Sequence, residues 1–346
     1  MNTKHFTTSI LIVFLLSSFV SCTSEDPFVV CKISEYDCDY QHQIPGILTV
    51  TKGSSRKHYI LTEKGMKKAE IKEGEPLSYS PKTGVSLIKE ITDSSIDVFA
   101  VDTKSGKTVS SEIVLKPERT EKDGKPFFAF PKLLSGCIQD DGTINLLVNY
   151  ENLLLTKDPK MPYSEEDAEI IDFLYVYEKG EAKNLKRYAF PQNEPSEGDF
   201  GDYFWEEPKF LQCAGEALYI FSEKQHANEI SLFYTPQPNW ILSRAGTQKE
   251  EGKITDMALI AYDDITFNYY SKKENALYTI ARSSEKDKAV LRITGLSEGY
   301  ELPESPVERK NGEFLFSETT DGKPLIFFIK ARGSIEEEQR IELLPL

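Results

Sequence analysis

Short apolar segments alternate with polar turns along most of the chain. They are rich in Val, Ile, Phe and Tyr, a composition typical of β-strands. Clear examples lie at residues 46–50, 58–61, 96–101, 144–150, 173–177, 217–222, 230–234, 276–281, 289–293 and 325–329. Few of them alternate strictly between apolar and polar positions, so the pattern predicts strands that are buried on both faces. One segment, SEEDAEII at 164–171, instead favours a short helix, because it has a serine N-cap and an acidic first turn.

Several of these segments resemble one another. The stretch 138–148 aligns with 211–221, Ala-Leu-Tyr occurs at both 217–219 and 276–278, and 215–223 resembles 312–318. Each unit contains a strand, a polar turn and a second strand. Strands buried on both faces need a neighbouring sheet on each side, and radial stacking of four-stranded blades provides this. We therefore predict an all-β fold of the β-propeller type.

The expected propeller covers residues 46–346. Because a blade takes about 45 residues, this length predicts about six to seven blades. A pair of tandem β-sandwich domains is the alternative, since it would show the same short strands.

The first 22 residues depart from this pattern. They read MNTKHFTTSILIVFLLSSFVSC, with one lysine, an apolar run from Ile10 to Val20, and then Ser21-Cys22. This is the pattern of a secretory signal, and the apolar run is shorter than the roughly 20 residues of a transmembrane helix. Phe19-Val20-Ser21-Cys22 resembles the lipobox of bacterial lipoprotein precursors, in the relaxed form of spirochaete and related lipoproteins. The predicted body is likewise similar to the divergent propellers of bacterial lipoproteins.

The resemblance implies a lipoprotein signal peptide at 1–21, which is removed, and a lipidated cysteine at Cys22. Residues 22–45 would then form a lipidated N-terminal tether. The expected location is the outer membrane of a diderm bacterium, on its periplasmic face or at the cell surface. The membrane would be contacted through the lipid anchor.

The remaining four of the five cysteines are open to pairing. Export permits disulfides. Cys31 and Cys38 are close in sequence and form a candidate bridge that would fasten the tether to the fold. Cys137 and Cys213 lie in two of the related segments, where a bridge and two buried thiols are equally acceptable.

Composition narrows the function classes. A formal net charge of −15 argues against nucleic acid as a partner, because a polyanion would be repelled. The sequence has only four histidines and no nucleophile-elbow, phosphate-loop, zinc-protease or dinucleotide-binding motif, so we predict no catalytic residue, metal or cofactor. The Asp140-Asp141-Gly142 sequence suits a hairpin turn better than a calcium loop.

An aromatic and acidic segment runs from Glu194 to Phe210. Its glycines and prolines exclude a regular helix and indicate a long connection. Core packing is the first interpretation, and a surface that stacks on a sugar or anchors a protein is the second. The candidate ligand-binding residues are Phe200, Tyr203, Phe204 and Trp205.

Three functions follow from these observations. The first is a membrane-anchored exported lipoprotein that binds a protein or glycan ligand without catalysis. The second is a propeller-type carbohydrate-active enzyme that uses carboxylates. The third is a scaffold in outer-membrane assembly. Several convergent acids with raised pKa values in one central pocket would favour the enzyme.

Overall fold

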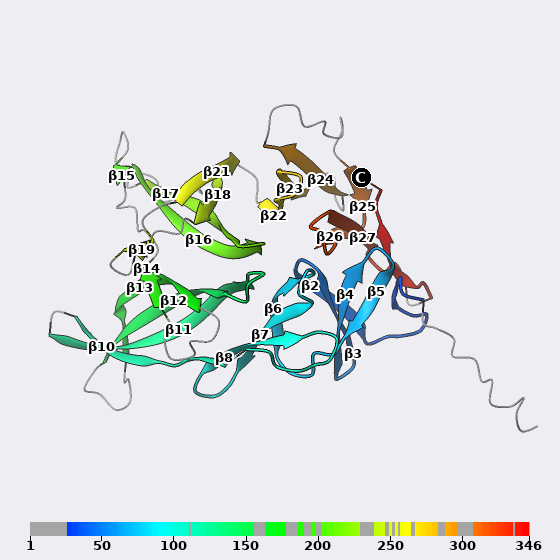
Figure 1. Ribbon diagram of the computed structural model, residues 1–346. Helices are drawn as coiled ribbons and strands as arrows, with labels where there is room; N and C mark the ends of the chain where they lie inside the picture. The colour runs from blue at the N-terminus through cyan, green and yellow to red at the C-terminus, as the bar shows by residue number, and fades with distance from the viewer. Residues whose placement is uncertain are drawn as a thin grey trace, which may run out of the picture.

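The computed structural model consists of six β-sheets that stand around a central axis as the blades of a propeller (Figure 1). It describes residues 26–345 except 111, 123, 156–162, 178–185, 190–195, 198–201, 229–238, 246–248, 251–252, 255–256, 264–266, 283–287, 297–306 and 335. All regular elements in this part of the chain are strands. It contains no helix with the length and apolarity needed to cross a membrane. The predicted β-propeller is thus confirmed, with six blades.

The strands follow one another outward from the axis in most blades. Blade 1 contains β2 (Cys38–Ile44), β3 (Ile47–Lys52), β4 (Ser55–Thr62) and β5 (Gly65–Ala69). Blade 2 contains β6 (Glu75–Ser80), β7 (Val85–Ile91), β8 (Ile96–Asp102) and β9 (Ile113–Leu115). Blade 5 contains β22 (Phe267–Ser271), β23 (Ala276–Arg282), β24 (Lys288–Gly295) and β25 (Val307–Lys310).

Blades 3 and 4 carry longer strands and additional short ones. Blade 3 contains β11 (Lys125–Ile138), β12 (Ile144–Leu155), β13 (Tyr163–Tyr177) and β14 (Lys186–Ala189), with β10 (Glu118–Lys122), β19 (Lys249–Glu250) and β20 (Lys253–Ile254) at its edges. Blade 4 contains β16 (Asp202–Ala214), β17 (Ala217–Asn228), β18 (Asn239–Ala245) and β21 (Met257–Asp263), with β15 (Ser196–Glu197) beside β16. The hairpin of β10 and β11 reaches away from the centre of the ring (Figure 1).

The core is divided among the interfaces between blades. Six clusters of buried apolar side chains occur in the described residues, one between each pair of neighbouring blades. In β27 (Pro324–Lys330), Phe327 packs towards Leu48 of blade 1, whereas the next residue, Phe328, packs towards Tyr278 of blade 5. Successive side chains of a strand point to opposite faces, so two buried faces produce a continuous apolar run. This explains why strict alternation is rare in the sequence.

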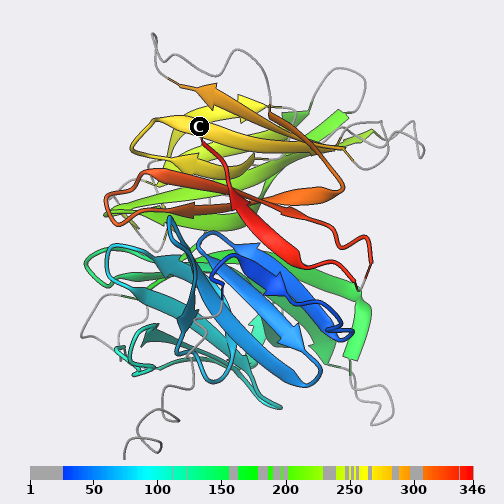
Figure 2. The ribbon, with the colours of Figure 1, turned by 90° about the vertical axis from the view of Figure 1, so that its right-hand side faces the viewer.

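Blade 6 is built from both ends of the chain and closes the ring. It contains β26 (Gly312–Glu318), β27, β28 (Gln339–Leu343) and, as its outermost strand, β1 (Val29–Cys31). The backbone N–H of Ile341 in β28 donates to the carbonyl oxygen of Phe28 at 2.9 Å. Figure 2 shows the blue N-terminal strands beside the red C-terminal ones.

The expected domain boundary at residue 46 is therefore too late. Strands β1 and β2 lie within the 22–45 segment assigned to the tether. The reason is that ring closure requires an N-terminal strand in the last blade.

The helix expected at 164–171 is also wrong. These residues lie in β13, which pairs antiparallel with β12 and sets Tyr150 opposite Ile171. An N-cap and an acidic first turn are weak local preferences, and pairing with a central strand overrides them.

Two disulfides join neighbouring blades. Cys31–Cys38 links the end of β1 in blade 6 to the start of β2 in blade 1. Cys137–Cys213 links β11 of blade 3 to β16 of blade 4. The structure thus contains the candidate bridge at Cys31 and Cys38, and it also pairs the two cysteines that the sequence left open.

The two bridges should differ in their contribution to stability. They close loops with sequence separations of 7 and 76 residues. Loop-closure entropy then gives about 2.5 kcal/mol for Cys31–Cys38 and about 4.5 kcal/mol for Cys137–Cys213. We expect the C137A/C213A double variant to lose about 2 kcal/mol more unfolding free energy than C31A/C38A in denaturant titrations. Equal losses in the two variants would contradict this expectation.

Candidate functional site

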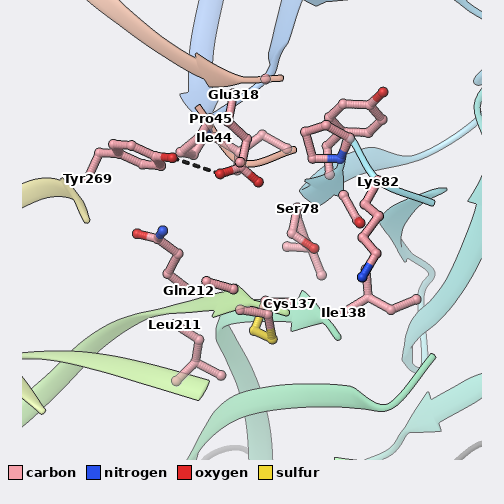
Figure 3. Close-up of a pocket in the computed structure, with 18 of the residues that line it drawn as sticks. Ile44, Pro45, Ser78, Lys82, Cys137, Ile138, Leu211, Gln212, Tyr269 and Glu318 are labelled. Carbon is pink, nitrogen blue, oxygen red and sulfur yellow. Dashed lines mark hydrogen bonds between the residues drawn. A yellow bond between two sulfur atoms is a disulfide. The ribbon is translucent and has the colours of Figure 1, made fainter. Parts of the chain in front are cut away.

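The inner strands of all six blades enclose a cavity on the propeller axis. It lies where each inner strand ends and turns into the second strand of its blade, and its volume is about 810 Å³ (Figure 3). This volume falls in the range of about 300–1,000 Å³ that is typical of small-ligand sites. One lining residue from each blade, in chain order, is Pro45, Ser78, Ile138, Gln212, Tyr269 and Glu318.

Glu318, at the end of β26, is one of the acidic residues that line this cavity. The hydroxyl of Tyr269 in β22 donates to Oε2 of Glu318 at 2.8 Å (Figure 3). Burial raises the pKa of the Glu318 carboxyl, and the negative charge of Asp140 raises it further, against the opposing effect of the Tyr269 hydrogen bond. Tyr269 is itself only 2% exposed, and burial keeps its pKa far above the usual value.

The other described acids that line the cavity each have a lysine partner. The pairs are Lys82–Asp140, Lys89–Glu75 and Lys273–Asp321. In the part of the chain that the structure describes, no Lys or Arg side chain pairs with Glu318. Among the described residues, the cavity therefore holds one half-buried carboxyl without a basic partner. This carboxyl accepts a hydrogen bond from the neutral hydroxyl of Tyr269.

The walls of the cavity are tied together across blade boundaries. The Gln212 side chain donates from Nε2 to the Tyr270 carbonyl at 2.7 Å and accepts at Oε1 from the Tyr270 N–H at 3.1 Å. The Asp140 N–H donates to the Gly215 carbonyl at 3.1 Å, close to the Cys137–Cys213 bridge. A wall held in this way is largely preorganised, which lowers the entropy cost of binding.

The aromatic segment lies elsewhere. Tyr203, Phe204 and Trp205 are residues of strand β16, where they pair with Ala227, His226 and Gln225 of β17. The cavity is lined by the opposite end of β16, from residue 210 onward. Phe200 lies outside the described residues.

The expected long connection is therefore wrong over residues 202–210. Pro208 is accommodated at a register shift between β16 and β17, and a bulge is one of the places where a strand tolerates proline. Phe210 stacks on Phe221 with ring centroids 4.1 Å apart, which places it in the core as expected.

The turn at 140–142 and the His42 side chain are both explained by structural hydrogen bonds. Gly142, with φ of 92°, closes the hairpin turn between β11 and β12, and its N–H donates to Gln139 at 3.0 Å. The His42 Nε2 lies 3.2 Å from the Phe316 carbonyl oxygen and donates to it, and burial lowers the pKa of this histidine to about 4. Among the described residues, no group of three His, Cys, Asp or Glu side chains could hold a metal ion.

Sequence reasoning missed the pair of Tyr269 and Glu318. The two residues are 49 positions apart and belong to no motif. They come together because their consecutive blades, 5 and 6, pack side by side in the ring.

Comparisons with known proteins add little. No protein-family model and no curated protein matches the chain. Among solved structures, the chain is similar to a crystal structure of the tricorn protease, with 12% identity and a TM-score of 0.35. The match covers 91% of this chain and 35% of that one, so the chain spans about a third of the length of the tricorn protease chain.

The environment of Glu318 predicts a pH-dependent stability effect. Its raised pKa means that the ionised carboxylate is disfavoured in the folded state, so the penalty exists at neutral pH and disappears below the ordinary value of 4.5. We expect Glu318→Gln, whose amide oxygen still accepts from Tyr269, to raise the unfolding free energy at pH 7. The gain should shrink as the pH falls towards 4.5. Denaturant titrations over this range measure it, and a gain that grows on acidification would refute the assignment.

Proposed function

We propose that this protein is a membrane-anchored exported lipoprotein whose propeller binds a protein or glycan ligand in its central cavity, without catalysis. The observation that carries the proposal is the cavity itself. All six inner strands enclose it, its walls are fixed by hydrogen bonds and a disulfide, and one carboxyl inside lacks a basic partner.

The ion pairs between lysines and most of the described acids in the cavity lining favour ligand binding over glycoside hydrolysis. Glycosidases use two carboxyl groups that act together, one of them with a raised pKa. Glu318 is the described acid of the cavity whose pKa is raised, whereas the other described acids of its lining are held by lysines. A single protonatable carboxyl suits recognition of a ligand better than a two-carboxylate reaction.

The cysteines support export and lipid anchoring. Four of the five cysteines pair with one another in two disulfides, which are typical of proteins outside the reducing cytosol. Cys22, at the end of the lipobox-like segment, is the cysteine outside these two bonds. It is therefore the residue we propose as the lipid attachment site.

The entry of the chain into the propeller indicates which face lies near the membrane. The Met66 N–H donates to the Pro27 carbonyl oxygen at 2.7 Å. Met66 lies near the start of β5, and the alternation of strand directions in blade 1 places that start at the cavity end. The four residue steps from Cys22 to Asp26 span at most about 14 Å. A lipid on Cys22 would therefore hold the cavity mouth towards the membrane surface.

Lipidation is tested by Cys22→Ala. In cells fed labelled palmitate, we expect the unchanged protein to incorporate label and to enter the detergent phase. The variant should incorporate none and should partition into the aqueous phase, since acyl chains supply the membrane affinity. Detergent partitioning that survives in the variant would count against the anchor.

The orientation is tested at the two ends of β8. Ser94 lies just before this strand, at the end away from the cavity, and Lys104 lies just after it, at the cavity end. The strand separates them by about 23 Å. With a fluorophore on Ser94→Cys or Lys104→Cys, nitroxide-labelled lipid head groups should quench the Lys104 site more strongly in reconstituted vesicles. Stronger quenching at Ser94 would reverse the proposed orientation.

A further inference from the structure

We infer that the central cavity binds the ammonium group of a lysine side chain, presented by a flexible basic segment of a partner protein, with Glu318 as its counter-charge. The inference rests on the proposed function, because it takes the cavity as the ligand site and names what enters it.

The Glu318 carboxylate has no balancing positive charge among the described residues of the cavity. Burying an ionised carboxylate without a cation is costly, and a bound cation offsets this cost. Around Glu318, the neighbouring charge that acts on it is negative, since Asp140 shifts its protonation in the same direction as burial does. The site thus favours a positive group over a neutral hydroxyl or an anion.

The lysines that line the cavity in the described part of the chain do not pair with Glu318. Lys82 and Lys273 each pair with an aspartate of the lining, and Lys89 pairs with Glu75. Lys272 donates from Nζ to the Ala214 carbonyl at 3.4 Å. The cation therefore has to come with the ligand.

Hydrogen bonding at Glu318 favours lysine over arginine. One carboxylate oxygen, Oε2, already accepts from the Tyr269 hydroxyl at 2.8 Å. A guanidinium group binds best as a fork to both oxygens, whereas an ammonium group acts as a compact charge that needs one. Among the described residues, none makes a hydrogen bond or ion pair with the other oxygen of Glu318, which leaves it available for such a contact.

The walls suit the rest of a lysine side chain. Apolar side chains that line the cavity include Pro45, Ile138 and Leu211 (Figure 3). The four-carbon stem of lysine packs readily along apolar surface while its ammonium group meets a polar partner. A preorganised cavity with apolar walls and the Glu318 carboxyl in its lining fits such an amphipathic side chain.

The overall charge points to a basic protein segment as the carrier. A chain with a formal net charge of −15 attracts cationic partners over long range and speeds their encounter. A flexible segment can present one extended side chain to a cavity that the six blades enclose on all sides.

The experiment is calorimetric titration of the full-length protein with two capped tripeptides. One is acetyl-Ala-Lys-Ala-amide, and the other carries N-acetyl-lysine on its side chain, which removes the charge. We expect saturable binding of the first peptide and about 10- to 100-fold weaker binding of the second, as for loss of a charge-assisted hydrogen bond.

Matched variants locate the effect. Glu318→Gln keeps the shape and the Tyr269 contact, and it should weaken the lysine peptide by about 10- to 100-fold. Asp93→Asn removes the same charge from the exposed turn between β7 and β8, at the far end of blade 2. It should leave affinity within about twofold.

Three outcomes would overturn the inference. They are no saturable binding of the lysine peptide up to about 10 mM, equal affinity for the two peptides, and unchanged affinity in Glu318→Gln. Other outcomes distinguish an error in the lysine inference from an error in the proposed function. If both peptides bind equally and the cavity-filling change Ile138→Trp abolishes binding, the cavity is a ligand site and only the lysine inference is wrong. If the unchanged protein incorporates no labelled palmitate, the proposed lipid anchor is wrong, but the peptide-binding result still tests the lysine inference.

Discussion

Burial of both faces of every blade is the constraint on which the rest of this structure depends. A strand such as β17 sends Ile220 towards blade 3 and Phe221 towards blade 5. Neither face is stable in water, so each sheet needs two neighbours, and only a closed ring supplies them without leaving an end blade exposed. The pairing of β1 with β28 meets this requirement, because the last blade becomes complete only when the N-terminal strand joins it.

Ring closure also creates the cavity. Six inner strands arranged around an axis cannot pack against one another at their centre, so the space between their ends stays open. The stacking of blades around the axis also brings side chains from different blades to face each other there. Tyr269 and Glu318 belong to adjacent blades, and their hydrogen bond joins β22 to β26 at the cavity wall. The arrangement of the six blades around one axis therefore produces both the fold and the cavity.

The sequence predicted the strands and the propeller because burial of both faces is written into local composition. It predicted less well which position each strand takes within its blade. The segment 312–318 resembles 215–223 in sequence, yet it forms the inner strand β26, whereas 217–222 belongs to the second strand β17. Apolar runs look alike in every position of a blade. The prediction of a helix at 164–171 is wrong because it considers only local preferences. The segment becomes a strand by pairing with β12, and this partner is visible only in the tertiary structure. Glu318 carried no local signal at all.

The Tyr269–Glu318 contact bears on whether the cavity is functional. A carboxyl that served only to tie two blades would do so at a cost, because burial raises its pKa and disfavours its charged form. A glutamine could accept the same hydrogen bond without that penalty. The nearby acids avoid the cost through lysine partners, as Asp140 does with Lys82. Proteins often keep locally unfavourable groups at functional sites, so a destabilising carboxyl inside a preorganised pocket supports the proposed binding site. Under the proposed function, the cation that balances this charge comes with the ligand.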